Sequence, residues 1–414
     1  MNDKIRNNHE VLLPAARVAL FSHDADTVAA VQALAADWRF ARVKFDVIEG
    51  DVAKAIETYK DEAAHNLIIL QTDDINESFT GALETLAGFC DENTGAVVIG
   101  PQNDVNLYRK LIDMGVEDYL MRPVSTAQMG DIIAKTLIEQ VGVGDARLIA
   151  FAGAKGGMGT SVLAQAMAWG VSEILGQKTI FLDAAGGWST ASVGMGFEPT
   201  TTLSEAARAA ANEDEDSLNR MLYKAGDNLT VLASGGESML DDAVGAKAFE
   251  KLLDILMVKY PVVIADLSGA SSKLQKAIIA RAHQINIIST ATLPALRLAR
   301  ALHKEIKDVR GGTQEALSLL VNMHGMSSAH EVSKGDIEKA MGLKPAAYIP
   351  FEPKVFLACE AEGRKIIDNK QGLEILETTL LPLIRNVLAI DTDAANSKKD
   401  DGGFIGNILN KLRS

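Results

Sequence analysis

The chain has 414 residues and a formal net charge of −14 at pH 7, with a sequence pI of about 5.1. Its length allows two or three domains with ample cores, and its acidity argues against non-specific nucleic-acid binding, which needs clustered Lys and Arg. Two distant cysteines, Cys90 and Cys359, exclude a disulfide framework or a C-x-x-C metal site, so we expect a reducing cytoplasm.

Residues 15–140 alternate between strand-like and helix-like patterns. A helix is predicted over residues 26–37, and apolar runs predict five strands: Arg17–Phe21, Lys44–Ile48, Asn66–Leu70, Gly95–Ile99 and Asp118–Leu120. Five strand–helix units predict an α/β domain with a doubly wound parallel sheet.

The end of this first domain carries a family signature. Residues 114–124, Met-Gly-Val-Glu-Asp-Tyr-Leu-Met-Arg-Pro-Val, resemble the end of a response-regulator receiver domain, which is flavodoxin-like. In that register Gln71 stands at the phospho-acceptor aspartate, Arg122 at the lysine, and Ser22 and His23 at the acidic pair. A carboxamide is not a phosphorylation nucleophile. We therefore interpret the domain as an atypical receiver that serves interaction or dimerisation.

Two aspartates near the acceptor position leave an alternative. Asp73 and Asp74 follow Gln71 in a different register, and we expect them to be solvated loop acids. Phosphorylation at one of them would make the domain a phosphorelay output module. The loop residue His23 is expected to be ordinary polar surface.

A short linker is predicted at residues 141–146, because its glycines interrupt every pattern. After it, a strand-like run over 147–151 leads into the glycine-rich loop 151–161, and 162–169 has the pattern of a helix. Such a loop points backbone N–H groups at phosphate oxygens, helped by the helix N-terminus. Ser161 stands where a P-loop places its Mg²⁺-ligating hydroxyl, and Thr160 stands in place of the lysine. The alternative is a strand-to-helix turn without a ligand.

The loop resembles the deviant P-loop K-G-G-x-G-K-[TS] of the ParA/MinD family of ATPases. In that family the early lysine, matched here by Lys155, reaches across a dimer interface to the partner's nucleotide. The resemblance implies a P-loop NTPase domain over residues 147–390 and an ATP-binding loop of seven residues: Lys155, Gly156, Gly157, Met158, Gly159, Thr160 and Ser161.

Four later segments match the family in order: 178–183, 260–266, 317–322 and 347–354. The first two are strands that end in acids and imply a Mg²⁺ site of Ser161, Asp183 and Asp266. A terminal carboxylate of this kind suits a hard cation. The last two imply adenine contacts from Asn322, Pro350, Phe351 and Glu352.

The chain also departs from the family pattern. Ala185 replaces the acid that orients the attacking water, Thr160 replaces the second lysine, and Ser268 replaces a proline after the second acidic strand. Phosphoryl transfer depends on such positioning and charge groups. We therefore expect ATP binding with weak or absent hydrolysis. The alternatives are an active positioning ATPase and a scaffold with a vestigial site.

The C-terminal part is predicted to be separate from the domains. Residues 391–403 are polar and charged, which is typical of a flexible linker. Residues 404–414 place apolar side chains on one helical face, so 404–413 could dock on a partner or a membrane surface, or pack on the chain itself. The polar first ten residues predict no signal peptide, and no apolar run is long enough to span a membrane.

An atypical receiver joined to a P-loop domain without its lysine resembles one subgroup of the ParA/MinD family, the CpaE/TadZ pilus assembly proteins of Flp (tight-adherence) type IV pili. The resemblance covers residues 15–390. It implies a cytoplasmic homodimer that binds ATP and Mg²⁺, marks a site such as a cell pole, and recruits pilus secretion machinery. It implies no nucleic-acid partner.

Overall fold

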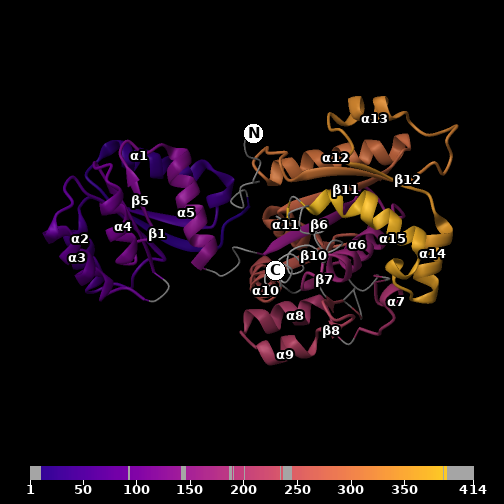
Figure 1. The fold of residues 1–414 in the computed structure, drawn as a ribbon, viewed down its shortest axis with the longest axis horizontal. Coiled ribbons are helices and arrows are strands. Elements are labelled where there is room, and N and C mark those ends of the chain that lie inside the picture. The colour runs from indigo at the N-terminus through magenta and orange to yellow at the C-terminus, as the bar shows by residue number, and fades with distance from the viewer. Residues whose placement is uncertain are drawn as a thin grey trace, which may run out of the picture.

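The structure is a computed structural model that describes residues 11–91, 94–140, 146–185, 189, 191–199, 201–233, 235, 245–385 and 387–388. Two units, each built on its own sheet, lie side by side (Figure 1). The predicted fold class, two doubly wound α/β domains, is confirmed. The predicted linker 141–146, apart from Ala146, lies outside the described residues, as do the linker 391–403 and the helix 404–414.

The first unit has five parallel strands in the order β2-β1-β3-β4-β5. The strands are β1 (Ala16–Phe21), β2 (Val43–Ile48), β3 (Leu67–Gln71), β4 (Gly95–Gly100) and β5 (Asp118–Met121). The helices are α1 (Ala25–Ala33), α2 (Val52–Tyr59), α3 (Glu77–Ala87), α4 (Val105–Asp113) and α5 (Thr126–Gln140). Side-chain oxygens of Asp24, Asp51, Asn76 and Asp104 cap the first four helices by accepting backbone N–H bonds.

The second unit has an eight-stranded sheet in the order β13-β12-β11-β6-β10-β7-β9-β8. Its strands are β6 (Arg147–Gly153), β7 (Thr179–Asp183), β8 (Tyr223–Lys224), β9 (Leu229–Leu232), β10 (Val262–Asp266), β11 (Gln284–Thr290), β12 (Leu317–His324) and β13 (Ala347–Pro350). All neighbouring pairs are parallel except β8 with β9. Because β6, β7 and β10 are adjacent and parallel, their carboxyl ends meet at one edge.

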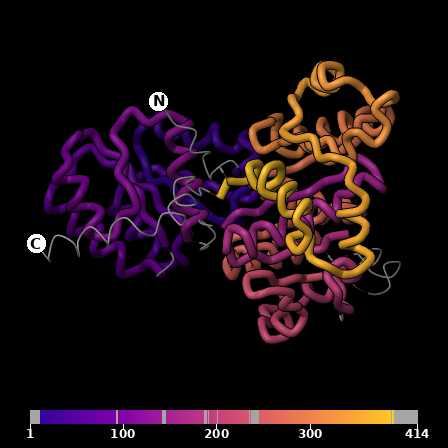
Figure 2. The backbone as a smooth tube through the Cα atoms, turned by 45° about the vertical axis from the view of Figure 1, so that its right-hand side comes forward, coloured from indigo at the N-terminus to yellow at the C-terminus, as the bar shows by residue number. Residues whose placement is uncertain are grey.

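Helices cover both faces of the larger sheet. The helices α8 (Leu203–Ala211), α10 (Ala246–Lys259), α11 (Ser272–Arg281), α12 (Leu293–Val309) and α13 (Lys334–Met341) pack in that order as neighbours. A separate hydrophobic cluster joins the sheet to α6 (Thr160–Trp169), α14 (Pro353–Glu362) and α15 (Lys370–Ile375). In Figure 2 the helices α14 and α15, coloured orange to yellow, lie together on the larger unit. Shorter helices are α7 (Ala191–Met195), α9 (Glu215–Arg220) and α16 (Pro382–Arg385).

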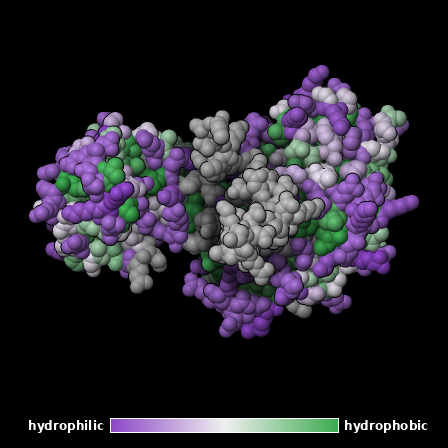
Figure 3. Space-filling model, viewed as in Figure 1, coloured by the Kyte–Doolittle hydropathy of each residue, from purple (hydrophilic) through white to green (hydrophobic). Residues whose placement is uncertain are grey.

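The two units are in direct contact. The Leu12 N–H donates to the Ala280 carbonyl at 2.9 Å, and Arg42 forms a 2.9 Å ion pair with Glu250. The Trp38 ring lies so close to Gly311 that a Cβ there would overlap it. One hydrophobic cluster contains residues of both units, so the core is continuous across the contact. The surface is mainly hydrophilic, with small hydrophobic patches on both units (Figure 3).

Two local predictions were inaccurate. The predicted helix 26–37 ends as α1 at Ala33 and continues in two 3₁₀ turns, 34–36 and 38–40. Asp37 accepts from the Arg39 N–H at 3.0 Å and so begins the second turn instead of extending the helix. The helix that follows the glycine-rich loop, predicted over 162–169, starts two residues earlier, because Thr160 is its first residue.

Candidate functional site

The glycine-rich loop joins the end of β6 to the start of α6. Gly157 and Gly159 both adopt φ = +77°, a conformation that favours glycine. A Cβ at Gly153 would overlap Thr160 Oγ1, so the Thr160 side chain turns back against β6 and is buried, only 4% exposed. Lys155 is exposed and forms no ion pair among the described residues. The loop therefore has the backbone of a phosphate cradle, with its only lysine turned to solvent.

Two acidic strand ends lie beside this loop. Asp183 of β7 and Asp266 of β10 are direct partners in the sheet register, and both are fully buried. Burial raises the pKa of Asp266, because a charged carboxylate is poorly solvated there. Its Oδ2 has no hydrogen-bond partner among the described residues. Asp183 Oδ1 accepts from the Ala185 N–H at 3.2 Å. The predicted metal residues are thus brought together.

A hydroxyl network connects Asp266 to the loop. The Ser161 and Ser268 hydroxyls are 2.7 Å apart. Asp266 Oδ1 accepts from the Ser268 hydroxyl at 2.7 Å and from the Ser268 N–H at 2.9 Å. Ser161 therefore points toward the carboxylate, as a shared cation would require. Sequence analysis found the Ser268 replacement but not its contact with Ser161.

The predicted adenine residues lie at the same edge. Asn322 is buried near the end of β12 and donates from Nδ2 to the Met158 carbonyl at 2.8 Å, which ties the strand to the glycine-rich loop. The N–H of Phe351 donates to the His324 carbonyl at 3.0 Å. This bond places Pro350, Phe351 and Glu352, which lie at the end of β13 and the start of α14, next to β12.

The described geometry meets one simple requirement of a magnesium–nucleotide site: a buried carboxylate oxygen lacks a partner beside a glycine cradle. The residues Ser161, Asp183 and Asp266 fit a hard cation, while the loop fits phosphate. No cluster of three or more His, Cys, Asp or Glu side chains with metal-binding geometry occurs in the part of the chain that was described. A cation here would therefore need oxygens from a ligand or water.

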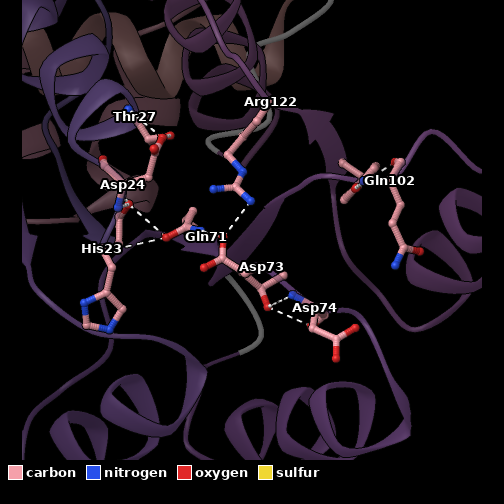
Figure 4. Close-up of polar contacts among 11 residues, drawn as sticks. His23, Asp24, Thr27, Gln71, Asp73, Asp74, Gln102 and Arg122 are labelled. Carbon is pink, nitrogen blue, oxygen red and sulfur yellow. Dashed lines mark hydrogen bonds and ion pairs between the residues drawn. The ribbon is translucent and has the colours of Figure 1, made fainter.

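The first-unit residues that the resemblance aligns with a phosphorylation site form polar contacts with one another (Figure 4). Gln71, at the end of β3, is buried and accepts through Oε1 from the His23 N–H at 3.0 Å and from the Ser22 hydroxyl at 3.2 Å. Its Nε2 donates to Asp73 Oδ1 at 3.0 Å. The carboxamide at the predicted acceptor position is thus satisfied by hydrogen bonds within this unit.

Asp73 is a solvated loop acid, as expected, with its side chain 78% exposed, but it also has a charged partner. Arg122 forms a 2.6 Å ion pair with Asp73, because Gln71 has no charge to offer the guanidinium (Figure 4). Asp24 caps α1, and its hydrogen bonds with Thr27 lower its pKa. Asp74 stays exposed, as expected. The site is therefore a closed set of polar contacts.

No helix in the described residues is long and apolar enough to cross a bilayer. No family model and no curated protein matches the chain. Among solved structures, it is similar to the pilus assembly protein CpaE from Caulobacter crescentus CB15, with 30% identity over 30% of this chain and 93% of that chain and a TM-score of 0.29.

Two further solved structures are similar. A CpaE2 pilus assembly protein from Sinorhizobium meliloti 1021 shares 34% identity over 29% of this chain and 98% of that chain, with a TM-score of 0.28. A ParA family ATPase from Chlorobium tepidum TLS shares 20% identity over 54% of this chain and 92% of that chain, with a TM-score of 0.49.

Proposed function

Because this chain belongs to the family of CpaE-type pilus assembly proteins, we propose that it is a localisation and assembly factor of Flp (Tad) type IV pilus secretion machinery. It binds ATP with Mg²⁺ at the interface of a homodimer and hydrolyses it weakly or not at all. The observation that carries the nucleotide part is the Ser161–Ser268–Asp266 network beside a glycine cradle, with one buried carboxylate oxygen lacking a partner.

The loop residues 155–161 hold the phosphates through backbone N–H groups and the N-terminus of α6. Ser161 and Asp266 hold Mg²⁺, with Asp183 beside them; when bound, the ion neutralises phosphate charge. Asn322 and residues 350–352 surround the base. To bind Mg²⁺, the Ser161 hydroxyl gives up its contact with the Ser268 hydroxyl. The charge of a bound cation would also lower the pKa of Asp266, which burial raises.

The second lysine of the family is absent, so charge compensation depends on Lys155. Because Lys155 is exposed and makes no ion pair within the described residues, it is available to the nucleotide of a partner copy. ATP then stabilises the dimer by linkage, since it binds the dimeric form preferentially. Slow hydrolysis follows from the absence of a positioning acid at Ala185 and of a lysine at Thr160.

The test is a calorimetric titration of the full chain with ATP and Mg²⁺, followed by sedimentation with and without nucleotide. We expect saturable binding and an ATP-dependent dimer. Lys155→Ala should lower the dimer fraction, whereas Lys344→Ala, which removes an exposed lysine elsewhere, should not. Equal dimer fractions in the wild type and Lys155→Ala would rule out this role for Lys155.

A scaffold with a vestigial site is the second candidate, and one observation favours it. The loop is tied to the rest of the unit by Asn322, which donates to the Met158 carbonyl, and by the contact between the Ser161 and Ser268 hydroxyls. No detectable heat up to millimolar ATP would make this the leading function. Measurable turnover would instead favour an active positioning ATPase.

A further inference from the structure

Two neighbouring helices of this acidic chain lie in a segment with a net positive charge. Residues 272–309, which contain α11 and α12, have seven Lys and Arg but two Asp and Glu, a net of +5 in a chain of −14. The rest of the chain therefore carries −19. One of the seven cations, Arg281, is buried in an ion pair with Asp254. The other six cations are not members of this ion pair.

Five of the cations form a surface that we call the basic face: Arg297, Arg300 and Lys304 on α12, and Lys273 and Lys276 on α11. The three α12 positions are spaced by three and four residues, so their side chains share one side of the helix. All five are exposed and, within the described part of the chain, none forms an ion pair. The two helices are packed neighbours, and in Figure 1 α12 runs through the upper part of the larger unit, below α13.

Apolar side chains accompany these charges. Leu293, in the first turn of α12, is 73% exposed, and Leu298, five residues later, is 44% exposed. Leaving large apolar side chains in water is unfavourable unless a partner covers them. A nucleic acid would use the cations but not the leucines.

We propose that the basic face is a peripheral contact for an anionic lipid surface, with Leu293 entering the headgroup region. Mobile anionic headgroups can approach all five exposed cations, and each basic side chain near such a surface adds to binding. This contact differs from the docking predicted for residues 404–413 and does not depend on ATP.

The test measures binding of the full chain to vesicles of phosphatidylcholine containing phosphatidylglycerol, and to vesicles of phosphatidylcholine alone. The variant replaces Arg297, Arg300 and Lys304 by Gln, all at exposed positions, so the fold should persist. Three lost cations should weaken partition into anionic vesicles roughly a hundredfold. Residues 404–413 are present in both chains, so their contribution cancels in the comparison.

The matched control replaces Lys60, Lys135 and Lys247 by Gln, which removes the same charge from exposed positions elsewhere. It should bind like the wild type, and Leu293→Ser should weaken binding at unchanged charge. Equal loss in both triple variants, or equal binding to both kinds of vesicle, would overturn the proposal. Preferential binding to duplex DNA or to poly-glutamate through the same three residues would also overturn it.

Discussion

The contact between the glycine-rich loop and β12 allows a sharp test of the site geometry. Gly157 and Gly159 have the same φ of +77°, but their surroundings differ. A Cβ at Gly159 would lie 2.5 Å from Asn322 Nδ2, whereas a Cβ at Gly157 would meet nothing within 4 Å. Gly157→Ala and Gly159→Ala therefore share the backbone cost and differ in the contact with Asn322.

The expected magnitudes follow from these two terms. A non-glycine residue in the left-handed region costs about 1 kcal/mol, so Gly157→Ala should lower the free energy of unfolding by about that amount. Gly159→Ala must also push Asn322 off the Met158 carbonyl at 2.8 Å. A buried hydrogen bond lost in this way costs about 1–3 kcal/mol more. The total for Gly159→Ala is therefore about 2–4 kcal/mol.

Urea unfolding of the full chain, followed by circular dichroism, measures both variants. Adding Asn322→Ala to each tests the cause, because it removes the group that the new Cβ would meet. The double variant with Gly159→Ala should lose less stability than the sum of its single changes. The pair with Gly157→Ala should be additive. Equal costs for the two alanine substitutions would refute the reasoning that Asn322 fixes the loop.

Three further predictions concern buried groups and the contact between the units. Burial raises the pKa of Asp266 above its ordinary 3.8, so the folded state loses stability as pH rises through the raised pKa; Asp266→Asn should be more stable than the wild type at pH 7 in urea unfolding, with a smaller difference below pH 3.8, where both states are protonated. Burial lowers the pKa of His283 from 6.5 to about 3, so its contribution is complete above pH 6.5 and falls by about 1.4 kcal/mol per pH unit below it. His283→Gln should flatten this acid dependence in urea midpoints between pH 7 and pH 4, and an unchanged slope would contradict the assignment. Gly311→Ala should lower the melting temperature more than Gly312→Ala, because both glycines have positive φ but only Gly311 faces the Trp38 ring; equal shifts would show that this ring does not bear on the interface.

The fold class was predictable because its signals are local. Apolar runs of five to eight residues that end in Asp183 or Asp266 have the pattern of buried parallel strands, and both end where predicted. The two-residue β8 was not predicted, because its residues are exposed and only its antiparallel pairing with β9 defines it. Strand order was likewise beyond the sequence, since it depends on contacts between distant segments.

The candidate site was predictable in its residues but not in its bonds. Spacing and resemblance indicated Ser161, Asp266 and Asn322, and the structure places all three beside the loop. The Ser161–Ser268 and Asn322–Met158 contacts join positions more than a hundred residues apart. The bond from the Ser268 hydroxyl to Asp266 depends on the rotamer of the serine side chain. The Arg122–Asp73 ion pair was not predicted for a similar reason. The resemblance to receiver domains singles out Gln71, whereas the guanidinium pairs with the carboxylate of Asp73, two residues later.

The continuous core between the two units has a consequence for the relative placement of partners that bind to them. Leu13 and Phe40 of the first unit belong to the same hydrophobic cluster as Phe249 and Ile278 of the second. Separating the units would expose the apolar part of their contact surface to water, which costs roughly 25 cal/mol per Å². While this contact between the units holds, a partner bound to the first unit keeps a fixed distance and angle to the glycine-rich loop. The orientation of such a partner relative to the loop, and not only its distance from the loop, is then determined by the contact between the units.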